Sequence, residues 1–266
     1  MKQLIFFTLQ EVINARLFRL MLLAPMVLSL LALTFTGLFM LDLGKVFVDS
    51  MFTTAHILCF AFLMFMTVPF LARDIEARFT YVLLTLPINR NQYLIGRFLG
   101  LTMAFLLLIS ALAVVSVLSL ELTQFIWDDL YMASANAGNI ILGIALISCQ
   151  YLSLMAVALF VFSWATGPAE VLSFTFLIWL LSWIFPPVLT AMQDADVAET
   201  VPPLLQAFLE GCYQLLPHLT GGDIANRLAH GASLSGSDIS LYIAEHTAYT
   251  VILLILSTLL FRRRNL

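Results

Sequence analysis

The stretch FLGLTMAFLLLISALAVVSVLSL, residues 98–120, contains no charged residue and no proline. A helix rises about 1.5 Å per residue, so a run of this length crosses the roughly 30 Å hydrocarbon core of a bilayer. The strands of a membrane barrel would instead alternate apolar and polar residues in shorter segments. Because a bilayer offers no water to pair with backbone groups, this continuous apolar run predicts a transmembrane helix.

Five further apolar runs surround this one in a chain of 266 residues that is 62% hydrophobic and only 11% charged. Soluble domains have about 25% charged residues, so this composition excludes a soluble globular enzyme, a disordered chain and a fibrous repeat. We predict an all-α, polytopic membrane protein in which residues 1–266 form a single transmembrane domain. The six predicted spans cover residues 18–40, 53–72, 98–120, 139–164, 169–191 and 241–261.

The distribution of basic residues predicts how these spans are oriented. With the N-terminus inside, ten of the twelve Lys and Arg residues fall in cytoplasmic segments, and only Lys45 and Arg227 fall outside. Cytoplasmic loops are enriched in Lys and Arg, whereas Asp and Glu contribute little to topology. Both termini are therefore predicted to be cytoplasmic.

The segment 73–97, between the second and third spans, is predicted to lie at the cytoplasmic membrane surface. Charged residues cluster at its start, an apolar stretch follows, and Pro87 interrupts any helix. Such a segment can bury its leucines in the bilayer and offer Asp74, Glu76 and Arg78 to an aqueous partner. The alternative is a lipid-surface loop whose arginines only set the topology.

A spaced pattern of residues runs from this segment into the third span. An acidic residue comes first, then a leucine-rich stretch, then Pro-x-x-Arg and two glycines: Glu76, Leu83, Leu84, Leu86, Pro87, Arg90, Gly96 and Gly100. This pattern resembles the permease subunits of type-2 ABC exporters, whose second and third spans are joined by an acidic residue, a leucine-rich stretch, Pro-x-x-Arg and a Gly-Lys pair. Arg97 stands at the usual lysine and keeps the charge, whereas Arg78-Phe79 replaces a Gly-Thr pair of the family. Among these permeases, the chain resembles the small class that includes the nitrous-oxide-reductase maturation permease.

The resemblance implies an N-terminal interfacial helix, a cytoplasmic coupling helix and a re-entrant outer helix before the sixth span. It implies an ATP-driven exporter of the cell inner membrane in which a dimer of separate ABC ATPase subunits binds ATP and Mg. The chain itself contains no Gly-x-x-x-x-Gly-Lys-Ser/Thr phosphate loop. A second permease copy, forming a homodimer, is also implied. The residues implied to couple to the ATPase are Arg73, Asp74, Glu76, Arg78, Pro87, Arg90, Gly96 and Arg97.

The outer segment 192–240 contains an apolar piece, residues 204–216, that is too short to span a bilayer. Prolines bracket this piece, so we predict a re-entrant or surface-lying helix. Its role is left open between a cap that only covers the bundle, an outer gate, and a docking surface for a periplasmic partner. The residues assigned to the gate are Pro202, Pro203, Pro217 and His218.

Other chemistries find little support in the sequence. The four histidines and three cysteines show no metal-binding spacing, no catalytic motif is present, and no nucleic-acid partner is predicted. Asn139, Gln150 and Ser163 of the fourth span are predicted to line the bundle interior, and Glu170 to lie in the first turn of the fifth. An ion-gradient-driven carrier or channel without an ATPase is the alternative function, and a structural subunit is a third. The nearly charge-free span interiors argue against the carrier.

Overall fold

The computed structural model describes residues 2–37, 43–76, 89–127, 135–193, 202–217, 227–228 and 234–263. Within these ranges every regular element is helical, which confirms the predicted all-α class. The helices are α1 Lys2–Asn14, α2 Arg16–Thr36, α3 Leu43–Phe62, α4 Val68–Glu76, α6 Arg90–Ile126, α7 Ala137–Trp164, α8 Pro168–Gln193, α10 Pro203–Leu215 and α12 Gly236–Arg263.

Six of the described segments are long and apolar enough to cross a membrane, as predicted from the sequence. They are Arg16–Thr36, Leu43–Glu76, Arg90–Ile126, Ala137–Trp164, Pro168–Met192 and Gly236–Arg262. The second and third spans are longer than predicted, because charged residues such as Asp74 and Arg97 lie within the helices instead of ending them. At 37 residues, α6 is about 55 Å long and extends beyond a hydrocarbon core.

The second span contains a π-helical turn, Leu63–Thr67, that joins α3 to α4. Pro69 lies two residues after this turn, and a proline ring clashes with the carbonyl four residues earlier in a regular α-helix. That carbonyl belongs to Phe65, inside the π turn. The wider turn accommodates the proline, so the span continues to Glu76 without a break.

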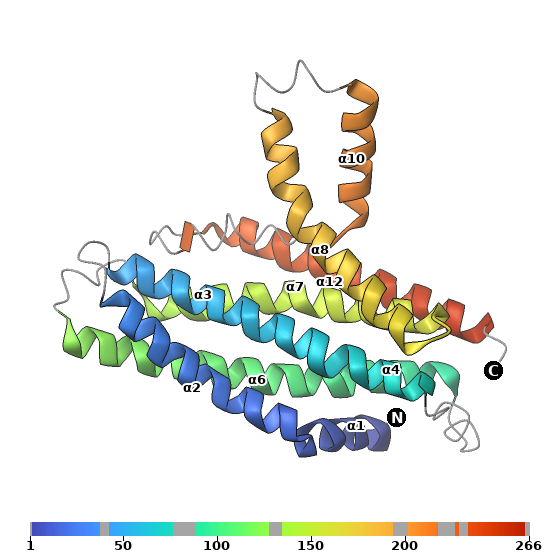
Figure 1. The fold of residues 1–266 in the computed structure, drawn as a ribbon, viewed down its shortest axis with the longest axis horizontal. Helices are drawn as coiled ribbons and strands as arrows, with labels where there is room; N and C mark the ends of the chain where they lie inside the picture. Colours follow the sequence, from blue (N-terminus) through green and yellow to red (C-terminus); the bar gives the residue numbers. More distant parts are fainter. Residues whose placement is uncertain are drawn as a thin grey trace.

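Helix α7 forms the centre of the bundle and contacts α3, α6, α8 and α12 (Figure 1). Its most apolar window is 78% buried, compared with 17% for α8 and for α12. Close packing is possible because α7 has Gly143 opposite α3. A Cβ atom there would lie 2.2 Å from Cε1 of Phe52, so the Phe52 ring sits directly on the α7 backbone.

The first helix and the last turn of α12 lie at the same end of the bundle, which we call the terminal end (Figure 1). Arg90 Nη1 donates to the Arg262 carbonyl at 3.3 Å, and Arg262 Nε donates to Asn91 Oδ1 at 3.0 Å. These contacts fasten the start of α6 to the end of α12. An even number of spans requires this arrangement, because it returns the chain to the side from which it began.

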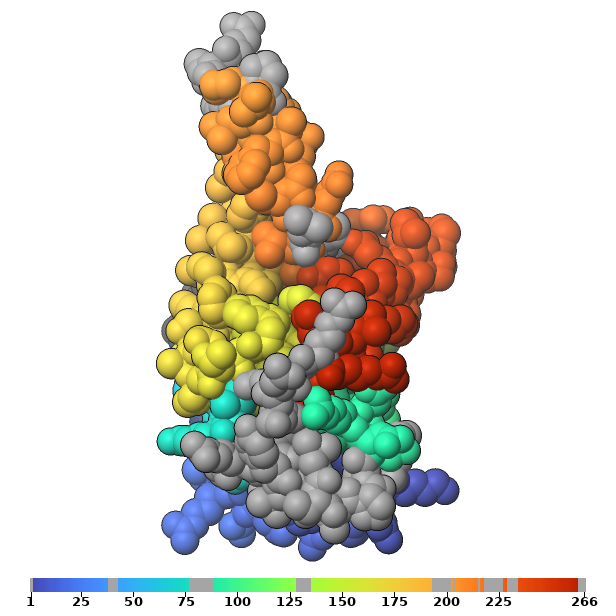
Figure 2. All heavy atoms as spheres, turned by 90° about the vertical axis from the view of Figure 1, so that its right-hand side faces the viewer, coloured from blue at the N-terminus to red at the C-terminus, as the bar shows by residue number. Residues whose placement is uncertain are grey.

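Helices α8 and α10 form a hairpin that projects away from the other helices (Figures 1 and 2). Helix α8 starts beside α4 and α7 and carries Pro186 and Pro187 in the half that departs. Helix α10 packs on α8 and exposes Leu204 and Phe208. The short helix predicted for residues 204–216 is therefore present, as Pro203–Leu215.

Candidate functional site

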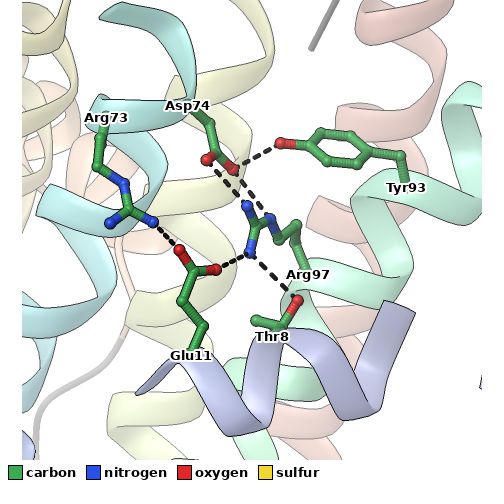
Figure 3. A network of polar contacts seen from close by, with 6 residues as sticks. All are labelled: Thr8, Glu11, Arg73, Asp74, Tyr93 and Arg97. Carbon is green, nitrogen blue, oxygen red and sulfur yellow. Dashed lines mark hydrogen bonds and ion pairs between the residues drawn. The ribbon is translucent and has the colours of Figure 1, made fainter. Parts of the chain in front are cut away.

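A network of charged and polar side chains joins three helices at the terminal end (Figure 3). Its members are Thr8 and Glu11 from α1, Arg73 and Asp74 from α4, and Tyr93 and Arg97 from α6. We call this set the three-helix network. The network lies at the end of α4 and the start of α6, the two helices that the connection 77–88 joins.

Arg97 is the centre of the network and is only 2% exposed. Its Nη2 donates to Asp74 Oδ1 at 2.9 Å, and its Nε lies 2.9 Å from Asp74 Oδ2. On the other side, its Nη1 donates to Glu11 Oε2 at 2.9 Å and to Thr8 Oγ1 at 3.3 Å. One guanidinium therefore binds two carboxylates that belong to different helices.

The remaining members extend the network from the interior to the surface. Tyr93 donates its hydroxyl to Asp74 Oδ2 at 2.6 Å, so both oxygens of this buried carboxylate are occupied. Glu11 also pairs with Arg73, whose side chain is 53% exposed and lies over the Phe70 ring at 4.8 Å. Two arginines balance two carboxylates, which is the condition under which charges are tolerated in a protein interior.

Two glycines of α6 allow α1 to approach closely enough for these contacts. A Cβ on Gly96 would lie 2.6 Å from Leu4 Cδ2, and one on Gly100 would lie 2.6 Å from Thr8 Cβ. The two glycines are four residues apart and so share one face of α6. Only a residue without a side chain fits there, and the resulting contact brings Thr8 and Glu11 to Arg97.

Replacing Gly100 by valine is expected to lower the free energy of unfolding by about 1–3 kcal/mol, because the added carbons would overlap Thr8 and force α1 away. Thermal unfolding of the purified protein in detergent measures this loss. Gly211→Val is the matched control, since Gly211 is also helical and nothing lies within 4 Å of a Cβ there. Equal melting temperatures for the two variants would contradict the proposed close contact.

Comparison with known families identifies the kind of protein to which this bundle belongs. A family model described as "ABC-2 family transporter protein" matches residues 12–200, more than two thirds of the chain. The chain belongs to the ABC-2 transporter family. It is the membrane permease subunit of an ABC transporter, a multi-pass transport subunit, and the family implies a partner ATPase. A comparison with curated proteins finds no match.

Family membership sets aside the ion-gradient-driven carrier that the permease sequence had left as an alternative. The matched region runs from the end of α1 through α8. It contains Arg73, Asp74 and Arg97 of the three-helix network, whereas Thr8 and Glu11 lie just before it.

The structure corrects one expectation about the coupling residues of the permease. Asp74 was expected to face an aqueous partner, but its side chain is 2% exposed and binds Arg97. The physical reason is that α4 continues to Glu76, so Asp74 lies three residues after the buried Leu71 on the inward face. The expectation that the Asp74 side chain is exposed to an aqueous partner is therefore wrong.

The other coupling residues divide into three groups. Arg73 and Arg97 belong to the network with Asp74, and Gly96 packs against α1. Glu76 is the last residue of α4 and is exposed, and Arg90 is the first residue of α6. Arg78, Pro87 and the leucine stretch between them lie outside the described residues.

Sequence reasoning missed Thr8, Glu11 and Tyr93 as members of the site. Thr8 and Glu11 lie three residues apart on α1 and so share one face with Leu4. A carboxylate on the apolar face of a helix needs a buried cation as its partner. Glu11 on the apolar face of α1, together with the Gly96 and Gly100 pair on α6, was the sequence signal that could have predicted the network.

Three of the residues assigned to an outer gate lie at the two ends of α10. Pro202 precedes the helix and Pro203 is its first residue, a position where the missing N–H costs nothing. Pro217 is buried just beyond the helix, and His218 lies outside the described residues. The prolines therefore define where α10 begins and ends.

Two further expectations concern polar residues of α7 and α8. Glu170 lies in the first turn of α8 as predicted, and accepts hydrogen bonds from the Thr166 amide at 2.7 Å and the Thr166 hydroxyl at 2.8 Å. Gln150 is fully buried in the bundle, as expected. A described hydrogen bond between α7 and α12 comes from Ser153, whose hydroxyl donates to the His246 carbonyl at 3.2 Å.

Within the described ranges, no three His, Cys, Asp or Glu residues are grouped to hold a metal.

Proposed function

We propose that this permease is the membrane half of an ATP-driven exporter, and that its ATPase dimer docks at the terminal end. Arg73, Arg90, Arg262 and Arg263 are all located at that end of the described helices. An excess of basic residues supports a cytoplasmic location for it, where ATP is available. ATP and Mg would be bound by the ATPase and not by this chain.

The observation that carries the coupling proposal is the buried Asp74–Arg97 pair. It joins the last turn of α4 to the first turns of α6, on the two sides of the connection 77–88. Tyr93 reinforces the same joint through Asp74. A force applied to the connection would therefore move the second and third spans together.

Glu11 extends this joint to the first span. Because Arg97 holds Glu11 as well as Asp74, a displacement of α6 would reach α1 and the span that follows it. In this proposal Arg97 and Asp74 position the helices, and the exposed Glu76 and the connection contact the ATPase. Arg78 and Pro87 keep the contact roles that the resemblance implies.

The remaining family features also belong to this proposal. Helix α1 buries Leu4, Thr8 and Val12 and exposes Phe6 and Phe7, which supports an interfacial helix with one face in lipid. The exposed apolar side chains of α10 support a re-entrant helix in the outer leaflet. We also propose that residues 1–266 form a single domain. We place the chain in the small permease class that includes the nitrous-oxide-reductase maturation permease.

Assembly provides the direct test of this function. We expect two copies of the permease and two ATPase subunits in one complex, as the resemblance to type-2 ABC exporters implies. Mass measurement of the detergent-purified complex, together with ATP turnover, checks this composition. A monodisperse monomer that transports without an ATPase would contradict the proposal.

The orientation has its own test, in a variant without Cys59, Cys149 and Cys212. A cysteine introduced at Ser235 should react with a membrane-impermeant maleimide on intact cells, and one at Glu76 should react only after lysis. The basic residues at the terminal end predict this outcome. Labelling at position 76 in intact cells would reverse the orientation.

A further inference from the structure

A second polar site lies beside the three-helix network, on its exposed side. A groove of about 510 Å³ runs between α1, the junction of α1 with α2, and α4. Its walls include the rings of Phe7 and Phe70, and its polar groups come from Gln10, Asn14, Glu11 and Arg73. Aromatic rings and polar side chains line the groove together, which is the pattern expected at a membrane interface.

The charges around this groove are mainly positive. Arg73 lines it, and Arg16 and Arg19 follow directly in the exposed first turn of α2. Arg19 Nη2 donates to the Asn14 carbonyl at 3.5 Å, which keeps this guanidinium at the edge of the groove. Glu11 is the carboxylate that lines the groove, and it is already paired with Arg73 and Arg97. Arg16 and Arg19 therefore add two exposed positive charges beside the Arg73–Glu11 pair of the groove.

The chain junction adds hydrogen-bond donors to these cations. Ala15 separates α1 from α2 in an extended conformation and offers no side-chain oxygen to cap α2. Ala15 lines the groove, and the uncapped first turn of a 21-residue helix carries partial positive charge. The amide groups of Gln10 and Asn14 can donate in addition.

The surroundings of the groove are suited to hydrocarbon. Phe6, Leu17 and Leu20 are exposed on the same two helices, with Phe6 at 65% and Leu20 at 64%. A soluble anion would gain nothing from this apolar surface, whereas the acyl chains of a lipid would cover it. A ligand that fits both the basic groove and the apolar surface around it has a phosphate group and a hydrocarbon tail.

We propose that this groove binds the headgroup of an anionic phospholipid in the leaflet at the terminal end. Arg73, Arg19 and Arg16 contact the phosphate, and the phenylalanines border the first part of the acyl chains. Because Arg73 also holds Glu11, the bound lipid becomes a further member of the joint between α1 and α4. The site does not depend on the direction of transport or on the substrate.

The test uses the full-length permease purified in detergent and titrated with phosphatidylglycerol, phosphatidylcholine or inorganic phosphate. Native mass spectrometry counts the retained lipids, and thermal unfolding reports stabilisation. We expect phosphatidylglycerol to bind and stabilise, and the other two ligands to have little effect. Arg19→Gln should weaken phosphatidylglycerol binding about fivefold, as expected for one arginine at a lipid surface.

Lys45→Gln is the matched control, because it removes the same charge at the start of α3, at the other end of the bundle. It should leave binding at the groove unchanged. Ala15→Leu is the second variant, which fills the groove without altering any charge, and it should also weaken binding. The proposal is overturned if Arg19→Gln and Lys45→Gln bind phosphatidylglycerol equally, if phosphatidylcholine stabilises as well, or if inorganic phosphate alone gives the same stabilisation.

Discussion

Replacing Arg97 by methionine is expected to destabilise the permease by about 3–5 kcal/mol, the largest stability effect among the described side chains of the site. Asp74 would stay buried at 2% exposure without its cation, and removing one partner of a buried pair leaves the other charge uncompensated. Glu11 would lose its inner partner in the same step. Denaturant unfolding in detergent, followed by helical circular dichroism, measures the loss.

Arg73→Met is the matched control for this prediction. Arg73 also binds Glu11, but its side chain is 53% exposed, so we expect its removal to cost no more than about 1 kcal/mol. The double variant Arg97→Met, Asp74→Leu should recover part of the stability, because no unpaired charge remains at the centre. If Arg97→Met and Arg73→Met were equally stable, Arg97 would not be the centre of the network.

Replacing Glu76 by arginine is expected to weaken ATPase docking by one to three orders of magnitude. Glu76 is exposed at the end of α4, where the connection to α6 begins, and reversing its charge would leave a partner cation unpaired. Loss of such an interfacial pair costs about 2–5 kcal/mol, which corresponds to this change in affinity. Co-purification of the ATPase and its ATP turnover, at equal permease expression, are the measurements.

Glu121→Arg is the control, since Glu121 is an exposed carboxylate near the other end of α6. It carries the same charge change and should leave docking intact. Both variants should fold, because neither residue belongs to the buried network. Unchanged docking in Glu76→Arg would assign the connection to lipid, as in the alternative of an arginine-anchored surface loop.

The two predictions separate two roles that the sequence pattern combined. All charged residues between positions 73 and 97 had been assigned to ATPase contact. In the structure Asp74 and Arg97 form a buried ion pair, whereas Glu76 is exposed. Sequence spacing does not distinguish these cases, since it does not say which face of α4 meets α6.

The six spans could be predicted from the sequence because their cause is local. A run such as 98–120 has no alternative in a bilayer, where each backbone group must find its partner within the same helix. The short helix α10 was predictable for a related reason: prolines at 202, 203 and 217 limit where a helix can form. The position of Glu170 followed from the favourable placement of a carboxylate in the first turn of a helix.

Which charged residues meet in the three-helix network was decided by the tertiary structure. Glu11 and Arg97 are separated by 86 positions, and they meet because Gly96 and Gly100 let α1 lie against α6. The pairing of Asp74 with Arg97 further requires that α4 remain helical past Pro69, through the π turn before it. Apolar content determines that a segment enters the membrane, whereas the shape of the helix faces determines which charges it buries together.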